Sequence, residues 1–134
     1  MKQISIFIEN KKGKLACVTS LLSEHGFNLR ALSIADTADY GILRIVADET
    51  EQAEKLLTEN GYLTKINEVI GVKIEDKAGS LNRIVTALSD ADVSVEYTYA
   101  FTSVEPGYAI MVLRVNDNAH ALAALEKAGI SAKL

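Results

Sequence analysis

The chain contains one sequence unit twice, and this duplication limits its possible folds more than any single residue does. The stretch 4–15 returns at 70–81, an offset of 66 residues, whereas Tyr40 returns as Tyr108, an offset of 68. The second copy has therefore gained two residues, near 103–106. Two copies are too few for a solenoid, so a paired domain with pseudo-twofold symmetry is expected.

Length and composition predict two small globular domains, residues 1–67 and 68–134, in a chain of 134 residues. Each unit is too small to bury much apolar surface alone, so we expect the two to share buried surface. Apolar residues make up 49% and charged residues 24%, which is typical of a soluble globular protein.

Charge and hydropathy exclude several classes of protein. The net charge is −4, and the densest basic cluster is Lys11, Lys12 and Lys14, so nucleic-acid binding is not expected. The apolar runs are too short to span a membrane, and the N-terminal residues lack the pattern of a secretory leader. A lone cysteine, Cys17, cannot form an internal disulfide, and the expected location is the cytoplasm.

Hydrophobic periodicity predicts the elements of the first copy. Residues 3–9 alternate as a strand, and a helix that starts at Gly13 and ends at Gly26 follows. Strands are expected at 28–36 and 40–48, then a helix capped by Thr50, then a strand at 62–66.

The second copy repeats this order, which gives an α+β fold of two ferredoxin-like βαββαβ repeats with strand order 4-1-3-2 in each. We expect the repeats to lie side by side in one eight-stranded antiparallel sheet with its helices on one face. An aromatic series at Tyr97, Tyr99 and Phe101 shares strand spacing with Val93 and Val95, and a buried sheet face explains it.

No constellation in the sequence predicts catalysis or a cofactor. His25 and His120 have no partner at the spacing of a metal site and are expected at the surface. Cys17 is expected to be a small buried thiol. The chain is therefore predicted not to be an enzyme.

What repeats instead is a corner between a strand and a helix. A polar residue, Asn10 or Asp76, leaves the strand, and Gly13 or Gly79 opens the helix three residues later. Unpaired amides at a helix start suit a carboxylate, and the polar side chain can accept hydrogen bonds from an ammonium group. The same pattern also occurs as an ordinary turn and helix start, so spacing alone leaves both readings open.

These residues resemble the ACT domain, a small ligand-binding module of amino-acid metabolism. The family's corner has an acidic residue, a glycine three residues after it and a leucine two residues after the glycine. Residues 76–81 are similar to this pattern, and 10–15 are similar with Asn10 in place of the acid. The stretches 25–29 and 92–95 resemble the family's entry to its second strand, and 35–44 resembles its hairpin. Where many members have proline before the glycine, this chain has Lys12 and Ala78.

The resemblance implies a stand-alone ACT pair that binds a free L-amino acid at the seam between its repeats. One implied site joins the first corner to the second copy's strand entry, and the other joins the second corner to the first copy's entry. The residues implied in binding are Asn10, Lys12, Gly13, Lys14, Leu15, Asn28, Leu29, Asp76, Ala78, Gly79, Ser80, Leu81, Ser94 and Val95.

Two other functions compete with the sensor. The chain can be a regulatory subunit that docks on an enzyme such as acetolactate synthase and relays feedback inhibition. It can also be a small enzyme of the acylphosphatase kind, but neither corner, 10–15 or 76–81, contains the arginine of such an enzyme's phosphate loop. The exposed strand edges can pair with a second copy to form a homodimer. The sequence does not reveal which amino acid binds.

Overall fold

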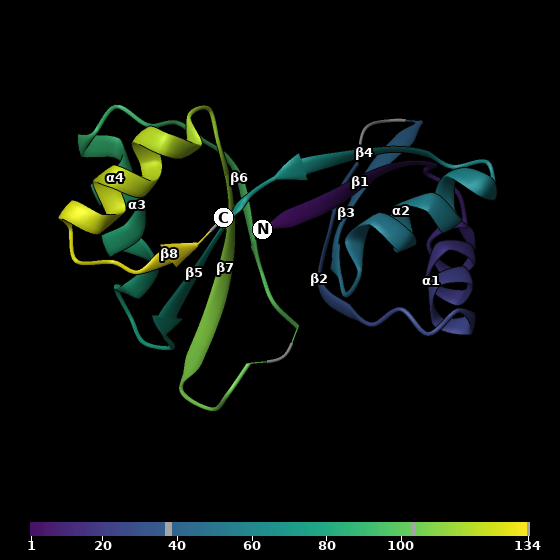
Figure 1. Cartoon of the computed structure of the whole chain (residues 1–134), viewed down its shortest axis with the longest axis horizontal. Helices are drawn as coiled ribbons and strands as arrows, with labels where there is room; N and C mark the ends of the chain where they lie inside the picture. The colour runs from purple at the N-terminus through teal and green to yellow at the C-terminus, as the bar shows by residue number, and fades with distance from the viewer. Residues whose placement is uncertain (37–38, 103, 134) are drawn as a thin grey trace. The chain divides into compact units, whose positions relative to one another are not determined.

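The computed structural model describes residues 1–36, 39–102 and 104–133, and it divides the chain into two compact units (Figure 1). The first unit comprises Lys2–Asn67, and the second comprises Glu68–Leu134 together with Met1. The elements of the first unit are β1 (Lys2–Glu9), α1 (Lys14–Glu24), β2 (Leu29–Asp36), β3 (Tyr40–Ala47), α2 (Thr50–Glu59) and β4 (Leu63–Glu68). Those of the second are β5 (Ile70–Glu75), α3 (Ser80–Asp90), β6 (Val95–Ala100), β7 (Tyr108–Val115), α4 (Asn118–Lys127) and β8 (Ala132–Lys133).

The order of the strands confirms the predicted fold of each repeat. The strands are arranged as β2-β3-β1-β4 in one sheet and as β6-β7-β5-β8 in the other. The prediction of one eight-stranded sheet was wrong, because the strands form two four-stranded sheets. Alternation of apolar residues specifies the buried face of a strand, but it does not specify which strand lies beyond an edge.

Both units bury one face of the sheet beneath their two helices (Figure 1). In the first unit, Ile4, Ile6 and Ile8 of β1 pack with Val18 and Leu22 of α1, as the sequence predicts. Full burial of one such aliphatic side chain contributes about 1.5–3 kcal/mol. The helix-side core therefore supplies most of the apolar stabilisation of each unit.

The aromatic series on β6 does not belong to this core. The register of β6 on β7 shifts between Val95 and Tyr97, which is a β-bulge. Val93 and Val95 pack on the helix side, but beyond the bulge Tyr97 and Tyr99 lie on the opposite face, opposite Arg114 and Val112. The prediction of a single face was wrong because one extra residue reverses the alternation.

Two smaller predictions also failed. Thr50 does not cap α2: Glu49 holds the cap position in the left-handed conformation, and the Thr50 hydroxyl donates to the Ala47 carbonyl. Cys17 is exposed, not buried, because it faces away from the stripe formed by Val18 and Leu22. His25 and His120 are exposed, as predicted.

The predicted turn at 37–39 and the two-residue insertion near 103–106 lie partly outside the described residues.

Candidate functional site

The two glycine corners have the same backbone geometry. Gly13 has φ 86° and Gly79 has φ 90°, and each holds the position just before its helix. A Cβ built on either glycine meets no atom within 4 Å, so the space there is open. Glycine is required for its left-handed conformation and not for close packing.

The hydrogen bonds of the two corners also correspond. The amide of Asn10 donates to the Asp39 carbonyl at 3.0 Å, and the amide of Asp76 donates to the Gly107 carbonyl at 2.9 Å. In each corner, the amide two residues beyond the strand-end glutamate then donates back to that glutamate's carbonyl. Each corner is thus fixed by backbone bonds that do not involve the side chain of Asn10 or Asp76.

The helix starts present amide groups without acceptors. Within the described part of the chain, the amides of Leu81 and Asn82 have no hydrogen-bond acceptor, and neither α1 nor α3 has an acidic residue in its first turn. The positive end of each helix is therefore not neutralised by its own residues, and it suits an anion.

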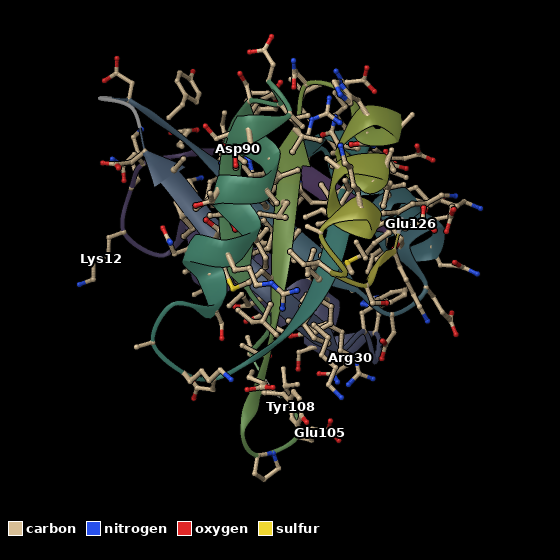
Figure 2. The ribbon with its side chains drawn as sticks, turned by 90° about the vertical axis from the view of Figure 1, so that its left-hand side faces the viewer. Lys12, Arg30, Asp90, Glu105, Tyr108 and Glu126 are labelled. Carbon is tan, nitrogen blue, oxygen red and sulfur yellow. The ribbon has the colours of Figure 1, made fainter. Side chains whose placement is uncertain are left out.

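A surface ion pair accompanies each corner. Lys11 Nζ lies 2.8 Å from Glu9 Oε2, and Lys77 pairs in the same way with Glu75. The hydrogen bond from Lys11 is the main cause that lowers the pKa of Glu9, and that from Lys77 lowers the pKa of Glu75. Lys12 is exposed and extends away from its corner (Figure 2).

A pocket of about 950 Å³ opens at the second corner. Of the predicted residues, Ala78, Gly79 and Ser80 line it, whereas Asp76 and Leu81 do not. Its apolar wall consists of Met1, Ile74 of β5, Ile84 of α3, Ile110 of β7 and Ile130. Four basic side chains, Lys73, Lys77, Arg83 and Lys133, share the lining with one carboxylate, Glu75.

The pocket lies beside the part of β5 that β8 does not reach. β8 pairs only with Gly71 and Val72 of β5, so the edge of β5 from Lys73 onward is not covered by a strand. The loss of strand pairing leaves an open edge between β5, the start of α3 and the segment before β8.

Met1 and Gly71 belong to this pocket and were not predicted. The Met1 carbonyl accepts a hydrogen bond from the Val69 amide at 2.8 Å, and the Met1 methyl group occupies the space that a Cβ on Gly71 would need. A glycine inside an apolar strand pattern is the signal that marks such a close approach. On the same face of β5 as Gly71, Lys73 lies over the Tyr108 ring, 4.3 Å from its centroid, and pairs with Glu105. Glu105 and Tyr108 lie close together in Figure 2.

The other predicted residues form the two strand entries. The Asn28 carbonyl accepts from the Asp48 amide at 3.1 Å, and Ser94 exchanges hydrogen bonds with Asn116. Leu29 and Val95 pack against the two cores. The structure thus gathers 10–15 into one corner and 76–81 into the other, and the joining of each corner to the other repeat's strand entry stays a prediction.

Among the residues that the structure describes, no group of three or more His, Cys, Asp or Glu side chains could hold a metal ion. None of the described helices has the length and apolar character to cross a bilayer.

Comparison with known proteins identifies relatives in both sequence and structure. The family model described as "ACT domain pair" matches residues 1–134. The chain is 34% identical over 76 residues to the acetolactate synthase small subunit of Buchnera aphidicola subsp. Baizongia pistaciae, covering 55% of this chain and 47% of the relative. The chain is also 30% identical over 80 residues to the acetolactate synthase small subunit of Mycolicibacterium smegmatis, covering 60% of this chain and 47% of the relative. The chain therefore matches about half the length of these relatives.

Two solved structures extend the comparison. Protein BT0572 from Bacteroides thetaiotaomicron has a TM-score of 0.90 at 33% identity, with 98% of this chain and 90% of that chain covered. The ligand-free regulatory subunit of aspartate kinase from Thermus thermophilus has a TM-score of 0.69 at 16% identity, with 95% and 91% covered. At that identity the second likeness concerns the fold alone.

Proposed function

This chain belongs to the ACT domain pair family, and on that premise we propose that it is a non-catalytic sensor of a free L-amino acid. The glycine corners are the binding elements. The observation that carries the proposal is the pocket at the second corner, where unpaired helix amides, apolar side chains and charged groups meet.

The parts of an L-amino acid match this lining. Its α-carboxylate would accept hydrogen bonds from the amides at the start of α3, as anions do at helix N-termini. Its ammonium group requires an acceptor, and Glu75 is the carboxylate in the lining, with Asp76 beside it as the acceptor predicted from the sequence. The isoleucines leave an apolar region for the side chain.

A thermal-shift screen of the full chain against the twenty L-amino acids tests this function. A specific ligand at a hundredfold excess over its Kd stabilises the folded state by about 2.7 kcal/mol and raises Tm. We expect at least one L-amino acid to do so, and ATP, NAD and DNA to leave Tm unchanged. A flat response to every amino acid at millimolar concentration would reject the sensor.

Variants then locate the acceptor of the ammonium group. Glu75→Gln should weaken binding more than Asp76→Asn if the pocket carboxylate holds the ammonium, and the reverse order would assign that role to Asp76. The equivalent substitution in the first unit, Glu9→Gln, is the matched control, because it removes an ion pair of the same kind from the other corner.

A regulatory subunit is the second candidate function, because two relatives are named acetolactate synthase small subunit. In this reading the amino acid would control a separate catalytic chain. Mixing the purified chain with an acetolactate synthase catalytic subunit tests it. Formation of a complex on size exclusion, together with feedback inhibition that the catalytic subunit alone lacks, would support this candidate, and no complex in the presence of ligand would reject it.

A further inference from the structure

The pocket at the second corner carries an excess of positive charge. Lys77 pairs with Glu75, and Lys73 pairs with Glu105. Among the described residues, no carboxylate lies within ion-pair distance of Arg83 or Lys133. Two cationic groups of the lining therefore form no direct ion pair, although Arg83 lies near enough to Glu75 to help Lys77 lower the pKa of that carboxyl.

These two cations come from separate elements around the same opening. Arg83 lies in the first turn of α3, and its Nη2 donates to the Ala128 carbonyl at 2.8 Å, which ties the guanidinium to the end of α4. One Arg–carbonyl bond leaves other N–H donors of the guanidinium for a ligand. Lys133 lies on β8, opposite Gly71 of β5.

We infer that this pocket selects acidic L-amino acids, aspartate or glutamate, over their neutral amides. The inference rests on the proposed function and adds the charge of the ligand's side chain to it. The amides of α3 hold the α-carboxylate, and Arg83 and Lys133 provide the charge for a second carboxylate. Charge-assisted hydrogen bonds from these cations favour a carboxylate over an amide of the same shape.

The first unit provides an internal contrast. At the position of Arg83 it has Cys17, at the position of Lys73 it has Phe7, and at the position of Ser131 it has Leu63. Lys65, at the position of Lys133, and Lys11, at the position of Lys77, retain the charge, and Lys11 is paired with Glu9. The selection is therefore a property of the second corner alone.

Isothermal titration of the full chain with four ligands tests the inference, because each acid has an amide of nearly the same shape. We expect aspartate or glutamate to bind at least about tenfold more tightly than asparagine or glutamine, which corresponds to one charge-assisted hydrogen bond. The preference should fall as salt concentration rises, since the cations are exposed.

Variants assign the preference to the two cations. Arg83→Gln and Lys133→Gln should each reduce the acid-to-amide ratio to below about threefold, because the acid loses more affinity than the amide does. Arg83→Lys should keep part of the preference, and the first-unit control Lys65→Gln should keep all of it. Because Lys133 makes no bond to α4, its variant tests the charge even if loss of the Arg83–Ala128 bond disturbs the fold.

Each outcome has a distinct meaning. Equal affinity for acids and amides, or a preference that survives both Gln variants, would overturn the inference and leave the proposed function in place. Failure of every L-amino acid to bind would reject the proposed function itself. Succinate is the added probe: if it binds where no amino acid does, the pocket accepts organic anions without an ammonium group, and the inference is also overturned.

Discussion

The two repeats have the same corner backbone but different surroundings. Both corners use a left-handed glycine and equivalent backbone hydrogen bonds. Around the second corner, Arg83 and Lys73 replace the Cys17 and Phe7 of the first. The comparison shows that both repeats keep the backbone of the corner, whereas the side chains around it differ.

The sheet faces away from the helices differ as well. In the first unit this face carries a buried polar chain, in which Gln3 Nε2 donates to Ser5 Oγ at 3.0 Å and Ser5 Oγ donates to Asn67 Oδ1 at 3.1 Å. In the second unit, Val69 and Gly71 hold the positions of Gln3 and Ser5. The helix-side cores are similar, so the repeats differ chiefly where no helix covers the sheet.

Separation of the repeats is the strongest test of this comparison. Residues 1–67 and 68–134, expressed as separate chains, should each lose cooperative folding or dimerise, because units of this size bury little apolar surface. The second fragment should suffer more, since it lacks Met1, whose carbonyl accepts from the Val69 amide. Circular dichroism measures the cooperativity of unfolding of each fragment, and analytical ultracentrifugation measures its association state. A monomeric fragment with a sharp melt would show that the repeats are independent.

Matched cavities in the two cores should have similar effects. Leu22 and Leu88 are equivalent, and both are fully buried in the helix-side cores. Leu22→Ala and Leu88→Ala should each lower the free energy of unfolding by about 2–5 kcal/mol. Urea denaturation of the full chain measures the loss. If the two losses of free energy of unfolding differed by more than about 3 kcal/mol, the width of the expected range, the helix-side cores would not be alike.

The corner glycines should respond equally to substitution. Gly13→Ala and Gly79→Ala should each cost about 1–2 kcal/mol, because a Cβ strains the left-handed conformation even where the space is open. Gly71→Ala is a useful contrast: its Cβ meets only the flexible end of Met1, so the Met1 side chain must move. A corner substitution without cost in urea denaturation would mean that the backbone there can relax.

Acidification should have the smallest effect. Hydrogen bonds from basic partners lower the pKa of Asp48 and of Glu9 and Glu75 in the folded state. A lowered carboxyl pKa stabilises the fold above the unfolded value, 3.8 for Asp and 4.5 for Glu, and this contribution is lost as pH falls through the folded value.

Tm should therefore decline below about pH 4.5. Asp48 forms a two-bond pair with Arg30, at 2.8 and 2.9 Å. Asp48→Asn should make the decline shallower, and added salt should also reduce it. In the second unit Asn116 holds the position of Asp48, so Asn116→Ala, which removes no charge, is the control and should leave the slope unchanged.

Several features could be predicted from the sequence because they depend on local physics. The offset between copies revealed the repeat, the alternation of Ile4, Ile6 and Ile8 identified their buried face, and Gly13 and Gly79 marked the helix starts. Backbone conformation at a glycine and the face of a regular strand are properties of neighbouring residues. The βαββαβ order followed from them.

Tertiary structure alone decided the remainder. The bulge before Tyr97 reversed an alternation that the sequence displays without interruption. The pocket lies along β5 beyond its pairing with β8, and this pairing joins segments that are far apart in the chain. Arg83 lies only four residues beyond Gly79, yet its importance follows from its contact with Ala128, 45 residues away. Hydrophobic periodicity predicts which side of a helix or strand is buried. Which side chains meet at a strand edge depends instead on packing between segments that are far apart in the sequence.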